Sequence, residues 1–427
     1  MRFRPALFGF GVPSLLLVIA IAVGQQPTRP PDKIQDRPKD GVQQPVRRGE
    51  NIVEQIFPPN GIMETAWKVE WDTEIRHGLV IKNAWFKRSP EHDWMQVLGD
   101  ARVCELFVPY HRGSPRFWDV TQYTFELTRV TADDAGPHGK IHISNNGRAT
   151  IPCVVEEIKD RGVIWKDNRG VRRGHTMLLW ACIDAANYRY LVEYGFQDDG
   201  CITFRCGATG HNLGGNEYVP HMHNVYWRVD VNLDGKDYNT AQLMERIEPK
   251  QGDKTKADVI HTTFNGGKEG FADWDASKFT MLRVINTQKK NARGENYAYD
   301  VMPARMGNSR HFGNGEACTQ HDFWVTKADP KEMTYRDLPK YINGENIENT
   351  DIVIWYSSPV FHEPRSEDGK IVNGQLWGCT HVGWAGFTFR PSNIFDQTPL
   401  YHPYNTGTPP QQGKGKGGFG KKGGGGD

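Results

Sequence analysis

Two histidines separated by a single residue, His221 and His223, are the feature of this chain with the clearest chemical meaning. In a β-strand, alternate side chains leave the backbone on the same face, so both imidazoles would point to one side. The residues that follow, as far as Val231, are mostly β-branched or aromatic, which favours a strand. Such a strand offers two nitrogen ligands to one metal ion, and imidazole suits copper, zinc, iron or nickel. The spacing alone is common, and it leaves open whether these are ligands or ordinary strand histidines.

The segments around this pair have the alternation of a large antiparallel β-structure, in which short apolar runs are separated by Gly, Asn and Asp. Three dipeptides suit hairpin turns: Asp199-Gly200, Asp234-Gly235 and Asn373-Gly374. Helical periodicity is scarce, and the clearest short helix is predicted at Thr240–Ile247. The fold class expected is all-β, a large antiparallel β-sandwich with few short helices. The clearest strand-like runs are 176–183, 188–196, 201–210, 225–233, 351–358 and 383–391.

The two ends of the chain differ in composition from its body. Residues 1–24 place two arginines before an apolar run that ends in small residues, which is typical of a secretory signal peptide. A membrane anchor is the alternative, but the apolar run is short for a span. Residues 25–50 are rich in Pro, Gln and charge, residues 405–427 are rich in Gly and Lys, and both are predicted to be disordered. We expect an exported protein without stable membrane insertion, whose residues 51–404 form one domain.

Charge and cysteine content exclude some functions. Lys and Arg number 52 against 51 Asp and Glu, and the net charge of +1 gives no support to nucleic-acid binding. Seven cysteines in an exported chain permit disulfides but leave at least one thiol unpaired. No CxxC motif occurs, so a thiolate zinc site is not expected.

Several further motifs, in a fixed order, resemble the catalytic domain of the copper amine oxidases, which are copper- and topaquinone-dependent primary-amine oxidases. The resemblance runs from about Trp67 to Pro399. It includes WKVEWDTEIRHGLVI near the start, CTQHDFWVT in the middle and RPSNIFDQTPL at the end. The segments that carry it, besides the histidine pair, are 102–110 with 117–123, 153–157 with 162–166, 187–190 with 207–210, and 351–356 with 362–368.

The resemblance implies a metal centre and an organic cofactor. His221, His223 and His362 would bind copper, and Tyr188 would be the tyrosine that is converted to topaquinone. The chemistry is consistent with this role, because a free phenol has a pKa near ~10 and is inert at neutral pH. Copper(II) stabilises the phenolate, which makes the ring electron-rich enough to react with dioxygen. The quinone then provides an electrophilic carbonyl for a primary amine.

Three other residues take roles from the same resemblance. Asp119 would be the catalytic base, Tyr110 would hydrogen-bond the quinone, and Asn187 would restrain its orientation. A carboxylate base of this kind works best when burial raises its pKa toward the working pH. The substrates implied are a small primary amine and dioxygen, and the family implies a homodimer.

A second, peripheral cation site of the calcium type is also implied. Oxygen ligands suit a hard cation such as calcium, but Asn232 stands where an aspartate is usual, which should weaken the site. Surface turn chemistry is the alternative explanation for these acids. The candidate ligands are Asp230, the Val231 carbonyl, Asn232, Asp351 and the Ile352 carbonyl.

The chain departs from the family pattern near the quinone position. Arg189 replaces an acidic residue and Asp184 replaces Ser or Thr, and both are expected to alter the cofactor's orientation or the entry of substrate. The stretch from Tyr110 to Asp119 is shortened, and Cys153 fits one half of a family disulfide whose partner is missing. The remaining strand-associated histidines, His175, His211, His321 and His381, fall on no ligand position and are interpreted as structural.

Three functions from different classes therefore remain open. The first is an exported copper amine oxidase that acts on primary amines. The second is a non-catalytic member that binds copper while Tyr188 stays unmodified. The third is a β-sandwich interaction or carbohydrate-binding module with structural calcium, against which the three-histidine set with Tyr188 and Asp119 argues.

Overall fold

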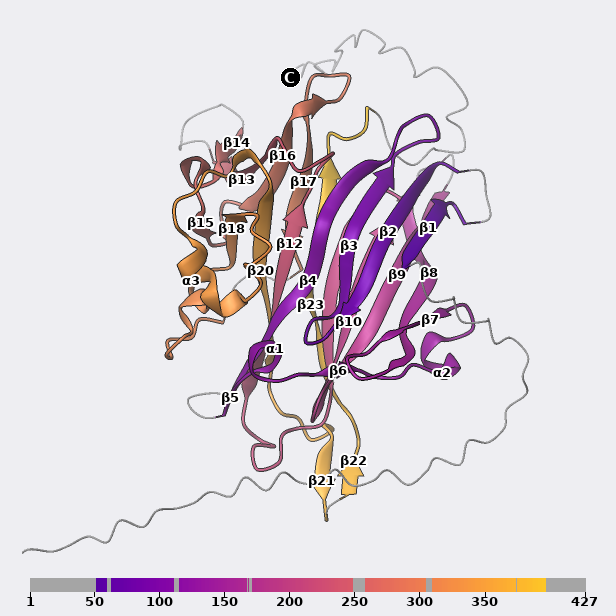
Figure 1. The fold of residues 1–427 in the computed structure, drawn as a ribbon, viewed down its shortest axis with the longest axis vertical. Helices are drawn as coiled ribbons and strands as arrows, with labels where there is room; N and C mark the ends of the chain where they lie inside the picture. Colours follow the sequence, from indigo (N-terminus) through magenta and orange to yellow (C-terminus); the bar gives the residue numbers. More distant parts are fainter. Residues whose placement is uncertain are drawn as a thin grey trace, which may run out of the picture. The chain divides into compact units, whose positions relative to one another are not determined.

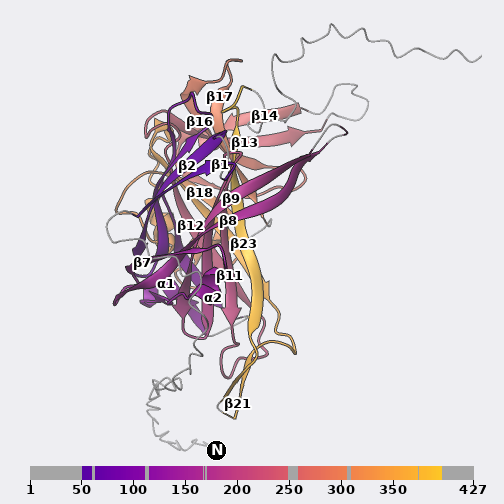
Figure 2. The same ribbon diagram turned by 90° about the vertical axis from the view of Figure 1, so that its right-hand side faces the viewer.

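The structure is a computed structural model that describes residues 51–59, 63–110, 115–166, 168, 171–248, 258–304, 309–373 and 375–396. The predicted signal peptide, linker and Gly/Lys-rich tail lie outside the described residues. Two antiparallel sheets dominate the part that is described (Figures 1 and 2). The all-β prediction is confirmed.

The first sheet contains the predicted histidine strand near its middle, between β4 and β20 (Figure 1). A short strand, β5 (Arg116–Trp118), pairs with β4 outside the main order. In spatial order the strands are β1 (Ile52–Phe57), β2 (Thr65–Glu74), β3 (Gly78–Lys87), β4 (Met95–Pro109), β12 (His221–Val231), β20 (Ile352–His362), β18 (Phe323–Lys327) and β15 (Gly270–Ala272).

The second sheet contains Tyr188 at the start of β10. Two short strands join it at the side, β19 (Glu348–Thr350) on β13 and β6 (Glu126–Leu127) on β9. In spatial order its strands are β14 (Asp258–Thr263), β13 (Asn239–Ile247), β16 (Met281–Lys290), β17 (Asn296–Pro303), β23 (Thr380–Ser392), β11 (Ile202–Gly210), β10 (Tyr188–Gln197), β9 (Val171–Ala185), β8 (Thr150–Lys166) and β7 (Lys140–Asn145).

The core lies between the two sheets. Trp67 of β2 is fully buried, and its ring centroid is 5.3 Å from that of Phe196 on β10. Trp227 of β12 packs in the same way against Tyr194 and Phe204 of the second sheet, at 5.9 and 5.8 Å. Aromatic side chains combine a large buried area with edge-on packing geometry. These contacts hold the strand of the histidine pair against the strand of Tyr188.

The helical prediction for Thr240–Ile247 is wrong, because the segment lies in strand β13. It pairs with β16 through Thr240–Met244 and with β14 through Gln242–Ile247. Long-range ladder hydrogen bonds on both sides outweigh a weak local helical pattern. The α-helices of the described ranges are single turns, as expected: α1 (Asp119–Gln122), α2 (Ala132–Ala135) and α3 (Leu338–Tyr341), with 3-10 turns η1 (Phe264–Gly267), η2 (Ala317–Gln320) and η3 (Tyr335–Asp337).

Two of the predicted turns join paired strands, and one does not. Asp199-Gly200 joins β10 to β11. Asp234-Gly235 has positive φ at both residues, 58° and 120°, but it connects β12 of the first sheet to β13 of the second and is not a hairpin. Asn373, with φ of 52°, stands between the paired short strands β21 (Lys370–Val372) and β22 (Gln375–Trp377), while Gly374 lies outside the described residues. Positive φ is tolerated by Asn, Asp and Gly, which is why these dipeptides mark hairpins.

The cysteines form no disulfide. All seven lie within the described residues and carry free thiols, and Cys379 is the exposed one. Cys153 is buried and unpaired, so the half-match to a family disulfide has no structural counterpart here. Within the described ranges, the longest apolar helix falls short of what a membrane crossing requires.

Candidate active site

Strands β12 and β20 bring the three predicted histidines together. His221 and His223 leave the same face of β12, and His362 stands directly opposite His221 in the antiparallel register. All three are buried, and one nitrogen of each lies within 4.8 Å of the other two. The close arrangement that the spacing predicts is therefore present. In the part of the chain that the structure describes, this is the one group of such residues with ligand-like spacing.

The outer nitrogens of two histidines are fixed by neighbours. His221 Nδ1 is 2.8 Å from the Val219 carbonyl, and His362 Nε2 is 3.0 Å from Asp368 Oδ2. A carbonyl and a carboxylate accept hydrogen bonds, so each outer nitrogen carries the proton. The inner nitrogens, His221 Nε2 and His362 Nδ1, are therefore bare lone pairs. They lie 3.3 Å apart.

His223 completes the cluster from a different direction. Its Nδ1 is 2.8 Å from the hydroxyl of Tyr190, and its Nε2 is buried without a hydrogen-bond partner among the described residues. Leaving a buried polar atom unsatisfied costs free energy, so such an atom indicates a missing partner. A metal ion at the inner nitrogens would supply that partner. Outer hydrogen bonds of this kind orient the histidine ligands of metal sites.

The electrostatics favour neutral imidazoles. Burial lowers the pKa of His221 to about 4, an effect that the nearby His362 increases. Burial and the two other histidines hold the pKa of His223 well below its usual value. Neutral imidazole is the form that binds metals. Three imidazole nitrogen donors suit copper better than a hard cation.

Tyr188 reaches this cluster from the second sheet. Its hydroxyl oxygen is 3.2 Å from His221 Nε2 and 3.2 Å from His362 Nδ1. The ring stands edge-on to His223, with centroids 4.5 Å apart. Burial raises the pKa of Tyr188 well above the ordinary value for a phenol. The tyrosine is therefore neutral until a cation stabilises its phenolate.

Tyr110 and Asn187 lie beside the cluster, as predicted. The Tyr110 ring stacks on His221 with centroids 4.2 Å apart. Burial and the charge of Asp119 raise the pKa of Tyr110, while a hydrogen bond with the Asn187 side chain lowers it. The same Asn187 amide donates to the His211 carbonyl at 3.0 Å. Both side chains are held by contacts on the flank of Tyr188.

Asp119 begins the short helix α1 and is buried. Burial raises its pKa well above the usual value, and the neighbouring Glu105 raises it further. The charge of Asp119 in turn raises the pKa values of Tyr110 and Tyr190, after their own burial. A carboxyl group with a raised pKa next to the tyrosine cluster is suited to proton transfer near neutral pH.

Glu105 is a residue of this site that sequence reasoning missed. It is fully buried, and its carboxylate accepts the backbone N–H of Val120 at 2.8 Å and that of Thr121 at 3.4 Å. These bonds hold the start of α1, and therefore Asp119, in place. Burial raises the pKa of Glu105 to about 7. Its distance of 14 positions from Asp119 in the sequence gives no local signal of this contact.

The two departures next to Tyr188 form a pair with each other. Arg189 and Asp184 are opposite one another in the β9–β10 register, and their charged groups are 2.7 Å apart. Successive strand residues point to opposite faces, so Arg189 leaves β10 on the side away from Tyr188. The expectation that these residues disturb the cofactor position is not supported by this arrangement.

The residues of the predicted calcium site are near one another, but they do not fit a cation. Burial and the charge of Asp351 raise the pKa of Asp230 to about 7. The ammonium group of Lys236 lies 3.3 Å from Asp351 Oδ2. The Asn232 amide nitrogen, in the orientation that satisfies both of its polar atoms, donates to Asp351 Oδ1 at 3.1 Å. Donors of the chain itself occupy both oxygens of Asp351, so calcium is not shown.

The remaining predicted structural histidines stay outside the metal cluster. His211 bonds the Asn187 carbonyl through its backbone N–H, and His321 stacks on Phe271 with centroids 3.6 Å apart. The His175 backbone N–H donates to Asp198. His381 is exposed on β23. These contacts agree with a structural interpretation.

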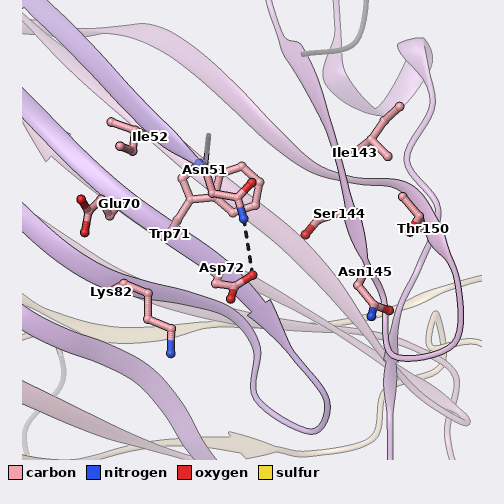
Figure 3. Close-up of a pocket in the computed structure, with 10 residues that line it drawn as sticks. All are labelled: Asn51, Ile52, Glu70, Trp71, Asp72, Lys82, Ile143, Ser144, Asn145 and Thr150. Carbon is pink, nitrogen blue, oxygen red and sulfur yellow. Dashed lines mark hydrogen bonds between the residues drawn. The ribbon is translucent and has the colours of Figure 1, made fainter. Parts of the chain in front are cut away.

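A cavity of about 410 Å³ lies apart from the cluster (Figure 3). Its lining includes Trp71 and Lys82. Asn51 and Asp72 also line it, and the Asn51 side-chain amide donates a hydrogen bond to the Asp72 carboxylate at 3.4 Å. None of the predicted catalytic or metal-binding side chains lines it. The chemistry of the chain is therefore argued from the buried histidine cluster rather than from this cavity.

Comparisons with known proteins agree with the site. The family described as "Copper amine oxidase, enzyme domain" matches residues 217–406. Histamine oxidase of Arthrobacter globiformis is 24% identical over 406 residues, which cover 80% of this chain and 56% of that protein. The peroxisomal copper-containing amine oxidase alpha 2 of Arabidopsis thaliana is 23% identical, covering 83% of this chain and 63% of the relative. The chain thus spans about three-fifths of these relatives.

Solved structures show the same fold. A copper-containing benzylamine oxidase from Hansenula polymorpha superposes with a TM-score of 0.63 at 18% identity, over 86% of this chain and 64% of that one. A lysyl oxidase from Pichia pastoris gives a TM-score of 0.65 at 16% identity, over 87% and 57% of the two chains. In the matched enzyme domain, in its sequence relatives and in its fold, the chain is similar to the copper amine oxidases.

Proposed function

We propose that this protein oxidises primary amines with copper and a topaquinone made from its own Tyr188. In the overall reaction, one amine, one dioxygen and one water give one aldehyde, one ammonia and one hydrogen peroxide. The observation that carries the proposal is the convergence of one nitrogen from each of three imidazoles and the Tyr188 hydroxyl in one buried place.

The donor set fits copper. His221 Nε2, His223 Nε2 and His362 Nδ1 would hold the ion, because their other nitrogens are engaged by outer partners. The unsatisfied His223 Nε2 is the strongest support, since a buried lone pair without a partner is costly. When bound, copper and the quinone supply the oxygen chemistry and the electrophilic carbonyl of the reaction.

The chain's own residues would then orient the amine and move its proton. Asp119 is the base that we assign to the α-carbon proton of the amine, because its raised pKa lets it hold that proton near neutral pH. Tyr110 and Asn187 would limit the rotation of the Tyr188 ring from its flank. The burial of the whole group excludes bulk water from the charged steps.

The test is maturation in air. The purified protein is stripped of metal, loaded with copper(II) and exposed to dioxygen. We expect redox staining for a quinone, an increased mass of the Tyr188 peptide, and peroxide release on a panel of primary amines. Tyr188→Phe should abolish staining and leave copper content unchanged. Tyr194→Phe is the matched control, because Tyr194 lies on the same strand and bonds only backbone carbonyls in the structure.

Each outcome separates the hypotheses. Bound copper with an unmodified Tyr188 peptide would overturn the oxidase proposal and leave a copper-binding protein. Quinone formation with peroxide release would support it. Quinone formation without peroxide from any amine would contradict the primary-amine assignment.

We also propose that the protein is exported and forms a homodimer. The composition of residues 1–24 supports export, and the similarity to the copper amine oxidases supports the dimer. Fractionation of the cells that make the protein and light scattering of the purified protein test these two proposals. Recovery in the cytosol or a monomeric mass would contradict them.

We do not propose calcium, since Lys236 and Asn232 already engage Asp351.

A further inference from the structure

We infer that Asn212 is a positioning residue that holds the Tyr188 hydroxyl toward the inner nitrogens of the histidine cluster. The inference rests on the proposed function, because Tyr188 is the residue assigned to become the quinone. Sequence reasoning gave Asn212 no role, and it lies in the connection between β11 and β12.

The orientation of the Asn212 side chain is fixed from several sides. It is 3% exposed, its Nδ2 donates to the Glu217 carbonyl at 2.9 Å, and its backbone N–H donates to the Gly369 carbonyl at 3.1 Å. The amide nitrogen is thus taken by an acceptor, and Oδ1 must face the site. This Oδ1 is 3.3 Å from the Tyr188 hydroxyl and 3.5 Å from that of Thr380.

The count of protons gives Asn212 its role. The Tyr188 hydroxyl has one proton, and three acceptors lie within reach: His221 Nε2, His362 Nδ1 and Asn212 Oδ1. A cation at the inner nitrogens uses the lone pairs of both histidines. Asn212 Oδ1 is then the acceptor that remains for the hydroxyl proton. The proton points away from the cation, and a lone pair of the phenol oxygen points toward it.

Asn212 therefore acts before any oxidation, on the neutral phenol. An amide oxygen cannot take the proton away, so Asn212 orients the ring and does not act as a base. The later conversion of the Tyr188 ring to the quinone is an oxidation by dioxygen. The tyrosine ring and two dioxygen molecules give the quinone, which has two more oxygen atoms and two fewer hydrogens, and one hydrogen peroxide.

The test compares Asn212→Leu with Thr380→Val. Leucine has nearly the size of asparagine but offers no acceptor to the hydroxyl, whereas valine at 380 removes only the second bond to the same amide. With saturating copper in air, we expect Asn212→Leu to slow the mass change of the Tyr188 peptide by about two- to tenfold, the range for one neutral hydrogen bond. Thr380→Val should change it by less than about twofold. Copper content and melting temperature are measured beside the rate. Asn212→Leu also loses the bond to the Glu217 carbonyl, so we expect a somewhat lower melting temperature but copper content at the wild-type level.

A second measurement does not depend on oxidation. It compares crystal structures of the zinc-loaded wild type and of zinc-loaded Asn212→Leu, which would show where the Tyr188 ring lies in each protein. We expect one ring orientation in the wild type, with the hydroxyl toward the histidines, and a displaced or multiple orientation in the variant. An unchanged ring in the variant would overturn the inference. Equal conversion rates in the two proteins would do the same.

The two proposals fail differently. If the wild type binds copper and Tyr188 never gains mass, the proposed oxidase function is wrong, and the zinc-loaded structures still decide the role of Asn212. If the wild type matures and Asn212→Leu matures at the same rate, the oxidase stands and the positioning role falls.

Discussion

Removing the hydroxyl of Tyr190 tests the interpretation of the histidine cluster most directly. Tyr190 is 2.8 Å from His223 Nδ1, and both residues are fully buried. Tyr190→Phe removes this partner without changing the shape of the ring. The buried Nδ1 then has no partner, which costs about 1–3 kcal/mol. The ring is also free to place its proton on Nε2, the nitrogen that would bind the metal.

The expected magnitude follows from the role of such outer hydrogen bonds. Loss of a partner that orients a metal-binding histidine typically lowers metal affinity by about 10- to 100-fold. We expect the copper dissociation constant of the metal-free protein to rise by that factor, measured by competition with a chelator of known affinity. Copper content at saturation should stay at the wild-type level, because the three ligands remain.

Tyr194→Phe is the control for this experiment. It makes the same chemical change four residues along β10, on the same buried face, where the hydroxyl is 3.2 and 3.3 Å from the carbonyls of Leu79 and Ala101. Both variants should lose some stability, but only Tyr190→Phe should lose copper affinity. Copper dissociation constants within about twofold of each other would refute the assignment of His223 as a ligand held by Tyr190.

Three further predictions concern other parts of the chain. The pKa of the Glu105 carboxyl is raised from 4.5 to about 7 in the folded protein. Between pH 4.5 and 7 the folded protein therefore keeps this carboxyl protonated while the unfolded chain loses the proton. The free energy of unfolding should fall by about 3 kcal/mol as the pH rises through this window. Glu105→Gln should flatten that fall in thermal melts, and an equal fall in the variant would contradict it. Millimolar calcium or a calcium chelator should leave the melting temperature of the copper-loaded protein unchanged, because Lys236 and Asn232 engage Asp351; a rise of several degrees with calcium would show an occupied site. Arg189→Ala should cost less than about 1 kcal/mol in denaturant unfolding, since its pair with Asp184 is half-exposed, and a loss of quinone formation in this variant would mean that Arg189 acts on Tyr188.

Much of the fold and the centre of the site were predictable from the sequence. Strand alternation and hairpin dipeptides are local signals, so β9–β12, β20 and β23 were found, and the His-x-His spacing fixed a common face for His221 and His223. The resemblance supplied His362 and Tyr188, which are distant in sequence. The segment Thr240–Ile247 was misassigned, because its neighbours β14 and β16 decide its conformation and lie beyond any local window.

The partners of the site residues were not predictable, for a related reason. Glu105, Tyr190 and Asn212 are ordinary residues in their local sequence, and their roles arise only from contacts with residues that are distant in the sequence. Asn212 contacts Tyr188 across 24 positions, and Tyr190 contacts His223 across 33. The pairing of Arg189 with Asp184 was not predictable for the same reason, since it joins two neighbouring strands.

The hydrogen-bond partners around the histidine cluster decide which imidazole nitrogens carry protons. The Val219 carbonyl and the Asp368 carboxylate each accept a hydrogen bond from the histidine that they contact. The unprotonated nitrogens of His221 and His362 therefore face inward. Inside, the hydroxyl of Tyr188 has one proton for several lone pairs, and His223 Nε2 has no partner at all among the described residues. Buried acceptors without donors cost free energy, and a cation at the centre would offset that cost. The protonation pattern imposed from outside is thus what would suit the centre to a cation, and Tyr188 is the group placed to respond to it.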